Sequence, residues 1–364
     1  IQRLTDQNIF TDQIFEGSNI SSMIDIIAYS YHVLLFYLNR TANESMFNES
    51  QIYENMNRIV KLLNYKPIGY QTSSLTFTAK AKTNLAPEFY TIPRYSFINI
   101  NGTKFSTIQD ITFTKSSSSE ELIDSIGNEN LLYQGTYMEY PVQSALGIDF
   151  EPLVMTTSTD TNIETNSINI YVKNINTGTF SEFKETESLY LETPSAKVFE
   201  KRLNENGLYE IKFGNGINGT RLNPGDKIHI YYLRSDGDKG IIPANTLTDN
   251  SMTLYSTTEF INIKNDIKIS NINYMTLDNI SKLEFSNKLP STNPNEKENV
   301  AEIREYAPKF FRGQQRLITK DDFINKIKTN FGNLLTDVSV LDNSSYIDSY
   351  LKYLDKLGLT NPNL

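Results

Sequence analysis

The sequence predicts an α+β fold, with an N-terminal helical region, a β-rich middle and an α+β C-terminal part. Three observations lead to this prediction. Before residue 65, apolar residues recur three and four residues apart, which is the period of a helix. From Thr72 the alternation changes to every second residue, as in a half-buried strand, and after residue 299 the helical period returns. We therefore expect three regions, with bounds at 1–68, 69–286 and 287–364.

Composition limits the class of protein. The chain has 364 residues, enough for two or three domains, because one core rarely grows past roughly 250–300 residues. The net charge is −9 and no run of Lys and Arg occurs, so nucleic acid is not an expected partner. The absence of cysteine excludes disulfides, thiolate metal sites and cysteine nucleophiles. Because the chain begins with Ile1 and not Met, we expect it to be part of a longer protein.

The most apolar stretch, Met23 to Leu38, predicts a buried helix. It is shorter than the roughly 20 residues that span a bilayer and contains Asp25 and His32, so no direct membrane contact is expected. Its apolar residues surround the helix, and such a helix must be covered on more than one face. Cover from the chain's own domain and cover from another subunit both remain open. The residues that we expect at a helix-bundle interface are Ile24, Ile27, Tyr31, Leu34, Leu35 and Leu38.

A second helix is expected from about Ser50 to Leu63, where Asn64 suits a left-handed cap and Pro67 cannot continue the helix. The middle of the chain then alternates as short strands. Ser116 to Ser119 are expected to be a loop, and the polar residues 157–167 a loop or a surface arm. The β-type runs are 74–79, 97–100, 104–113, 168–173, 208–213 and 227–233.

The C-terminal region starts with a polar, Pro-containing segment, 287–299, which predicts a linker. A short helix from about Val300 is expected to end at Pro308. Thr319 precedes two acidic residues and so predicts the cap of a further helix. Val338 and Val340 alternate as in a strand, and a last helix is expected to end at Gly358.

A cluster of glycines matches the G-x-G-x-x-G pattern of dinucleotide-binding loops. That pattern binds a pyrophosphate only where a helix opens directly after it. Here residues 220–226 contain Pro224 and a further strand follows, so we interpret the cluster as a turn between strands and expect no bound nucleotide. The expected structural-turn residues are Gly214, Gly216, Gly219, Gly225 and Pro243.

No motif for catalysis or metal binding stands out. Asp236 and Asp238 are two residues apart, but their loop lacks the Gly and Glu of a calcium loop. The two histidines, His32 and His229, are too few for a typical metal site, and no G-x-S-x-G nucleophile turn occurs. We therefore expect no catalytic residue, no metal and no cofactor, and we do not expect an enzyme.

Four segments, taken in order, resemble the baseplate J-like proteins and the related wedge protein of T-even-type phages. Each segment alone is a common turn pattern, but the shared order and spacing extend from about residue 20 to 340. Asn64, Asn215 and Gly313 depart from residues that are frequent in that family. The four segments are Leu62 to Pro67, Thr91 to Asp110, Phe213 to Thr246 and Ile303 to Phe323.

The resemblance implies a structural wedge subunit of the baseplate of a contractile phage tail. Such subunits form the ring around the hub and couple baseplate rearrangement to sheath contraction. The implied partners are the protein itself, as a dimer within a sixfold ring, other wedge proteins and the sheath-initiating protein. The implied location is the virion, after assembly in the host cytoplasm.

Two other classes remain open. A host-surface glycan-binding tail protein would also be rich in strands and Tyr, of which the chain has 22. A baseplate-associated glycosidase would need two carboxylates that lie close together in space, and no segment of the sequence singles out such a pair.

Overall fold

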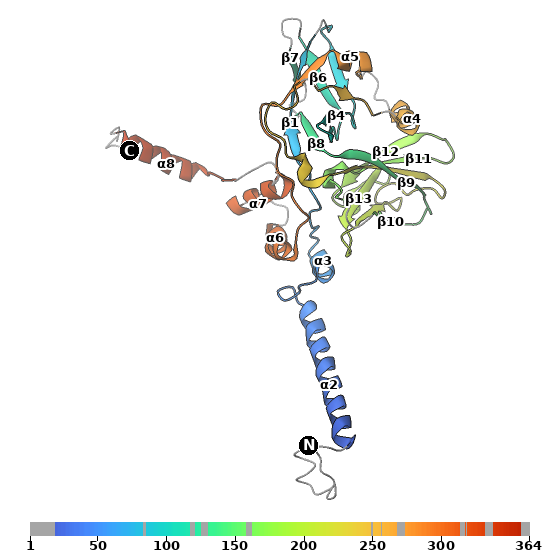
Figure 1. The fold of residues 1–364 in the computed structure, drawn as a ribbon, viewed down its shortest axis with the longest axis vertical. Helices are drawn as coiled ribbons and strands as arrows, with labels where there is room; N and C mark the ends of the chain where they lie inside the picture. Colours follow the sequence, from blue (N-terminus) through green and yellow to red (C-terminus); the bar gives the residue numbers. More distant parts are fainter. Residues whose placement is uncertain are drawn as a thin grey trace, which may run out of the picture.

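The chain forms an α+β structure, as predicted, with helices at both ends and strands between them (Figure 1). The computed structural model describes residues 19–82, 85–116, 121–124, 130–157, 162–248, 250–255, 257–267, 274–313, 317, 319–331 and 338–357. Ser117 to Ser119 and Gly358, which were singled out above, lie outside these described residues.

The two helices expected at the N-terminus are present as α2 (Asn19–Glu44) and α3 (Tyr53–Lys61). After α3, Asn64 has a φ of 56°, so it takes the left-handed conformation predicted for it. The amide of Tyr65 donates to the carbonyl of Val60 at 3.1 Å and closes this end of the helix.

The middle of the chain forms three sheets. Two of them have five strands each and share one apolar core. In spatial order, the first contains β1 (Ser74–Thr76), β8 (Leu131–Gln134), β5 (Thr103–Ser106), β4 (Phe97–Ile100) and β16 (Met252–Thr253). The second contains β17 (Leu283–Ser286), β2 (Thr78–Ala81), β7 (Glu121–Asp124), β6 (Ile111–Lys115) and β3 (Phe89–Ile92).

The third sheet has seven strands and its own core. Its pairs are antiparallel except that β12 and β13 run parallel. The order is β10 (Pro152–Val154), β14 (Tyr209–Phe213), β13 (Val198–Leu203), β12 (Phe180–Thr186), β11 (Asn169–Lys173), β15 (Lys227–Arg234) and β9 (Thr136–Ser144). The 3₁₀ turns η2 (Thr165–Ser167), η3 (Leu189–Leu191) and η4 (Gly237–Gly240) lie in its loops.

Two of the expected strands are each divided in the structure. The run 74–79 is interrupted at Phe77, whose amide bonds to the carbonyl of Asn130 at 2.9 Å, so β1 and β2 join different sheets. The run 104–113 is interrupted at Thr107, whose hydroxyl donates to the carbonyl of Pro93 at 3.2 Å. Alternation alone cannot show such interruptions, because apolar and polar residues can alternate on both sides of the break.

The polar residues 157–167 were expected to form a loop or a surface arm. Their described part is a loop that ends in η2, but it is largely buried and is not a surface arm. Ile163, Glu164 and Ser167 are at most 4% exposed. Hydrogen bonds compensate for the lost contact with water. The Ser167 hydroxyl donates to the carbonyl of Glu164 at 2.8 Å and accepts from the amide of Leu233 at 2.9 Å. The polar residues of this segment therefore form hydrogen bonds in the interior and are not on the surface.

The polar segment 287–299 has no helix or regular strand, but it is packed against the start of β1. The amides of Asn295 and Gln71 donate to each other's carbonyls at 2.8 and 2.9 Å. Asn287, Ser291 and Glu298 are each at most 8% exposed. The segment therefore lies along the β-rich part of the chain, where its backbone finds partners that the sequence does not reveal.

The C-terminal part holds α4 (Thr258–Ile267), α5 (Leu277–Ser281), α6 (Val300–Gly313), α7 (Lys320–Phe331) and α8 (Asn343–Lys356). Helix α6 continues through Pro308, where it was expected to end. A proline inside a helix costs about 3 kcal/mol because it lacks the amide proton and crowds the preceding turn. Packing beyond the proline offsets this cost, since Phe310 contacts the ring of Tyr65 at a centroid distance of 5.5 Å.

The expected cap of α7 is confirmed. The Thr319 hydroxyl accepts from the amide of Asp322 at 3.2 Å, and the Asp322 carboxylate accepts from the amide of Thr319 at 2.8 Å. Val338 and Val340 were expected to be in a strand, but residues 338–342 belong to no strand of the described part of the chain. Helix α8 follows and carries most of the last predicted helix.

Candidate functional site

Helix α2 projects away from the β sheets as a long arm (Figure 1). With 26 residues it is about 39 Å long, at 1.5 Å per residue. Its sequence contains neither Pro nor Gly, and Ile, Leu, Tyr and Ala follow one another through its middle. The local sequence therefore favours a helix along its whole length, and the exposed side chains determine what this helix can bind.

The apolar side chains of α2 are exposed around most of the helix. Ten large apolar residues are each more than half exposed, with values from 52% to 70%. A run of this kind on a free surface is typical of an interaction site and not of a solvent-facing helix. The ten are Met23, Ile26, Ile27, Tyr29, Tyr31, Leu34, Leu35, Phe36, Tyr37 and Leu38.

The six interface residues that the sequence predicted all lie on α2. Five of them belong to the ten exposed residues, and Ile24 is half-buried. The hypothesis that the helix is buried in its own domain is wrong for the described part of the chain, because that part does not cover it. The exposed surface extends around the helix, as its sequence predicted, and it includes Ile26, Tyr29 and Phe36, which lie outside the six residues predicted at the interface.

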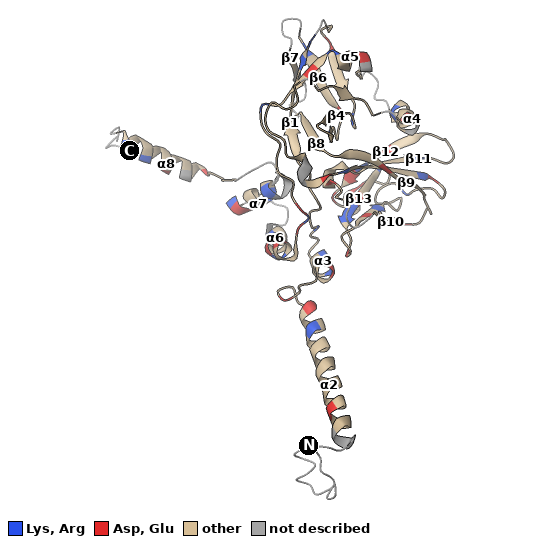
Figure 2. Ribbon diagram, in the orientation of Figure 1, with Lys and Arg blue, Asp and Glu red and all other residues tan. Residues whose placement is uncertain are grey.

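Polar residues on α2 form a narrow stripe. Asp25, His32 and Asn39 follow each other at intervals of seven residues, so they lie on one face of the helix. The rest of the helix carries few charges, as Figure 2 shows by its mostly tan ribbon. Because the stripe is narrow, the apolar surface is wider than the seam that a single partner helix covers.

Glu44, the last residue of α2, fixes the bend between α2 and α3. Its carboxylate accepts hydrogen bonds from the amides of Gln51 and Ile52 at 3.2 and 3.1 Å, and from the Asn55 side chain at 3.2 Å. Desolvation acts to raise the pKa of Glu44, but the hydrogen bonds from Asn55 and the two amides together hold it below its ordinary value. A charged carboxylate thus holds the amides at the start of α3, where anions are favoured.

At the base of the arm, α3 and α6 form a small apolar cluster. Met56 and Val60 of α3 pack with Ile303 and Ala307 of α6, and all four side chains are fully buried. Arg304 of α6 donates to the carbonyls of Ser50 and Phe47. The arm is therefore mounted on α6 as well as on the sheets.

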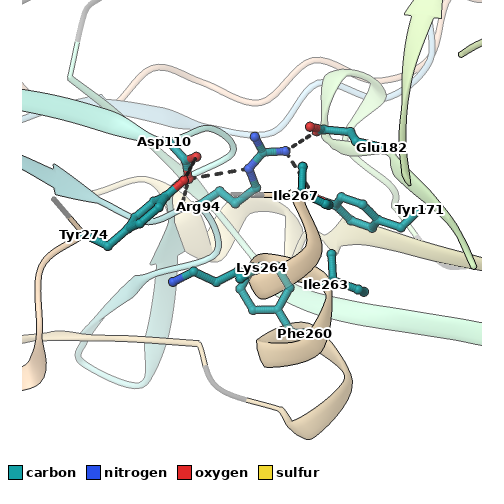
Figure 3. Close-up of a pocket in the computed structure, with 9 residues that line it drawn as sticks. All are labelled: Arg94, Asp110, Tyr171, Glu182, Phe260, Ile263, Lys264, Ile267 and Tyr274. Atoms are coloured by element: carbon teal, nitrogen blue, oxygen red, sulfur yellow. Dashed lines mark hydrogen bonds and ion pairs between the residues drawn. The ribbon is translucent and has the colours of Figure 1, made fainter. Parts of the chain in front are cut away.

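A second group of charged residues lies around Arg94 (Figure 3), between two β lobes: the two five-stranded sheets that share one core, and the seven-stranded sheet with its own core. The Arg94 guanidinium lies 2.5 Å from a carboxylate oxygen of Glu182 and 3.5 Å from one of Asp110, and it donates to the Tyr171 hydroxyl at 3.2 Å. Desolvation acts to lower the pKa of Arg94, but Tyr171 and the two carboxylates raise it above its ordinary value. Burial and Asp110 raise the pKa of Tyr274, which also lines this pocket, to about 12.

The cavity beside Arg94 is small. Its volume is about 50 Å³, enough for one or two water molecules and not for a substrate. Because both acids around it already face the arginine, the arrangement resembles a brace and not a binding site. It connects the loop after β3 to β12 of the seven-stranded sheet. No sequence motif marks this group, since Glu182 is 88 residues from Arg94 along the chain.

The expected turn residues lie in loops. Residues 214–226 connect β14 to β15 and contain no helix, so no helix N-terminus faces the glycine cluster. Gly216, Gly219 and Gly225 have φ values of +86°, +77° and +87°, which favour glycine, whereas Gly214 is required for space because a Cβ would lie 2.3 Å from Gly219. The exposed Pro243 offers its carbonyl to Asn287 at 3.0 Å.

The two histidines lie in different environments. His32 is exposed on α2, and His229 is buried on β15 with its Nδ1 3.4 Å from a carboxylate oxygen of Glu139. Among the described residues, no three His, Asp or Glu side chains are placed so that they could share a metal ion. Within the same part of the chain, no helix combines the length and the apolar character that a bilayer span needs.

Helix α8 is a second exposed helix that sequence reasoning did not mark as an interface. Ile347 and Tyr350 of α8, and Leu357 directly after it, follow a spacing of three and seven residues and are 47%, 51% and 53% exposed. The aromatic rings of Tyr346 and Tyr350 stack at a centroid distance of 6.4 Å. The apolar spacing that predicted this helix was the available signal, because it requires cover on one face.

Comparison with solved structures gives distant likenesses, of which two are described here. No family model and no curated protein matches the sequence. A chain in the TssK-TssF-TssG baseplate subcomplex of the type VI secretion system is similar over 84% of this chain and 81% of that chain, with 7% identity and a TM-score of 0.36. A chain in the baseplate of the anti-feeding prophage is similar over 97% of this chain and 64% of that chain, with 13% identity and a TM-score of 0.23. At these TM-scores the likeness does not establish a shared fold.

Proposed function

We propose that this protein is a structural, non-enzymatic wedge subunit of a contractile-tail baseplate, in which α2 joins helices of neighbouring subunits. The observation that carries the proposal is α2 itself, with ten exposed large apolar side chains on a helix that stands away from the sheets. The order of the four sequence segments described above supports the assignment to a baseplate. The ring around the hub, the pairing with other wedge proteins and the sheath-initiating protein, and the virion location belong to this proposal.

The physical reason for assembly is the exposed apolar area. Burying apolar surface yields roughly 25 cal/mol per Å², so a helix with ten such side chains gains several kcal/mol when partner helices cover it. The rest of the chain suits a rigid structural subunit, because the sheets are built on two apolar cores and the charged groups around Arg94 connect them. Movement would then occur as rigid-body rotation at subunit interfaces and would need no chemical step.

The test is a charge substitution in the apolar surface. In the double variant Leu34→Asp and Leu35→Asp, two charges would enter the helix interface, and we expect loss of incorporation into tail particles. The matched control is His32→Asp and Asn39→Asp, which adds two carboxylates to the polar stripe of the same helix. Incorporation is measured by mass spectrometry of purified particles, and folding of the β lobes by near-UV circular dichroism.

Normal incorporation of the Leu34/Leu35 variant would refute the role of α2, and loss in both variants would show an unspecific effect of charge. Cryo-electron microscopy of an intact particle tests the location. Sixfold-related copies around a tube support the wedge assignment, whereas a peripheral position with specific binding on a glycan array would support the glycan-binding alternative.

A further inference from the structure

Helix α8 lacks cover from the described part of its own chain. It extends to a different side of the β lobes from α2 (Figure 1), and none of the apolar core clusters of the described residues includes a residue of α8. The helix has 14 residues, and a helix of this length is only marginally stable in water by itself. Packing against another surface would therefore stabilise it.

The apolar residues of α8 lie on one face. At about 100° per residue they fall within an arc of about 160°, and the charged residues fall on the other side of the helix. Such a one-sided face is typical of a helix that packs against one partner, whereas α2 is apolar around most of its circumference. The large apolar residues of this face that are 47% to 60% exposed are Tyr346, Ile347, Tyr350, Leu351, Tyr353 and Leu357.

The apolar pattern of α8 is symmetric about Lys352. If two copies of the helix lie antiparallel with Lys352 at the centre, each residue of such a pair stands level with its mate on the other copy. A twofold interface requires this self-complementarity, because residue i contacts j while j contacts i. Apolar residues lie one, two and five positions from Lys352 on both sides, as the pairs Leu351 and Tyr353, Tyr350 and Leu354, and Ile347 and Leu357.

The charges of α8 favour the same antiparallel direction. The first half of the helix carries only Asp348, whereas the second half carries Lys352, Lys356 and Asp355. In an antiparallel pair the acidic half of each copy lies beside the basic half of the other, and Asp348 stands level with Lys356 of the other copy. The two helix dipoles then also oppose each other. A parallel pair would place like charges and like helix ends side by side.

We propose that the apolar face of α8 packs against α8 of a second copy of this chain, in an antiparallel pair with its twofold axis at Lys352. Neither the α2 surface nor the baseplate assignment enters this proposal. Six side chains that are about half exposed offer roughly 600 Å², compared with roughly 800 Å² per partner in a stable complex. The pair is therefore weak, and it joins copies that a second contact holds close together.

The test is disulfide cross-linking of the full chain, which has no cysteine of its own. Tyr350→Cys in one chain and Leu354→Cys in a second, differently tagged chain place two thiols level with each other in the antiparallel pair. Both chains carry Leu34→Asp and Leu35→Asp, so that α2 does not bring them together. After mild oxidation, intact mass spectrometry should show at least about five times more mixed dimer than dimer of either single chain, because a disulfide requires Cβ atoms close together.

Two controls test whether the contact is made by the apolar face. A mixture of Ser349→Cys and Asp355→Cys chains places thiols level with each other on the polar side, so the mixed dimer should be at least about fivefold less abundant. In the first mixture, adding Ile347→Asp to both chains puts a charge into the pair and should lower the mixed dimer to the level of this control. The matched change Ser349→Asp adds the same charge on the polar side and should leave the mixed dimer unchanged.

Three results would overturn the proposal. Equal amounts of mixed dimer in the first mixture and in the polar-side control would show that the apolar face is not a specific contact. An excess of single-chain dimers would indicate a parallel pair, and absence of cross-linked dimer would leave the face to a different protein. The substituted side chains are on an exposed helix, so near-UV circular dichroism should show unchanged β lobes. No measurement involves tail particles, so failure of this proposal is distinguishable from failure of the baseplate assignment.

Discussion

Helices α2 and α3 follow each other in the chain, and they differ in where their apolar side chains lie. In α3, Met56 and Val60 are fully buried, whereas the charged residues Glu54, Arg58 and Lys61 of the same helix are exposed. In α2, ten large apolar residues are exposed. The difference comes from the partner: α3 has α6, which the chain itself supplies, whereas no described part of the chain covers α2. A helix can thus be strongly apolar and still be incomplete within its own subunit.

Removing a buried side chain from α3 should give the largest effect on this comparison. Met56→Ala leaves a cavity between α3 and α6, and we expect a loss of about 3 kcal/mol in the free energy of unfolding. The measurement is a urea titration followed by circular dichroism. Phe310→Ala, at the far side of the same cluster, should also destabilise the chain. A change below about 0.5 kcal/mol for Met56→Ala would mean that α3 is not packed as described.

The same contrast can be drawn for charged groups. Arg94, whose side chain is 23% exposed, faces Asp110 and Glu182. Removing it in Arg94→Ala leaves two partly buried carboxylates, and we expect a loss of about 2 kcal/mol. Arg58→Ala breaks an exposed pair with Glu205 and should cost clearly less, because water already screens this pair.

Urea titrations at low and high salt measure both variants. The Arg58 effect should shrink with salt and the Arg94 effect should persist, because screening acts on exposed charges. Equal losses for the two variants would contradict the role of Arg94 as a brace between the β lobes.

Much of the fold was predictable because it depends on local spacing. The helix periods, the strands at 97–100 and 227–233 and the Thr319 cap are properties of neighbouring residues, and the structure contains them. Two errors come from contact between distant parts of the chain. The partly buried Phe310 packs on Tyr65 where α6 continues past Pro308, and bonds from Thr72 to Glu164 and from Leu233 to Ser167 bring a polar segment inside. A third error has no such cause, since Val338 and Val340 alternate and yet belong to no strand of the described residues.

The candidate site divides in the same way. The apolar surface of α2 is a property of one segment, so the sequence predicted Ile27, Tyr31 and Leu34 as interface residues, although the structure does not show what they contact. The Arg94 group and the buried carboxylates of Glu164 and Glu298 join residues from distant parts of the chain. A single Glu in a polar segment gives no sign that it will be buried, and only the three-dimensional arrangement shows it.

The smallest expected effect is the most direct test of the comparison. Leu34 is 61% exposed, so Leu34→Ala removes little buried surface in the isolated chain and should change the free energy of unfolding by less than about 0.5 kcal/mol. Urea titrations at two low protein concentrations measure it, and equal midpoints ensure that no association contributes. A loss near that of Met56→Ala would place Leu34 against its own chain and remove the ground for an intersubunit role. A near-zero change, together with lost incorporation of the Leu34/Leu35 double variant, would mean that α2 is stabilised by its neighbours in the assembly.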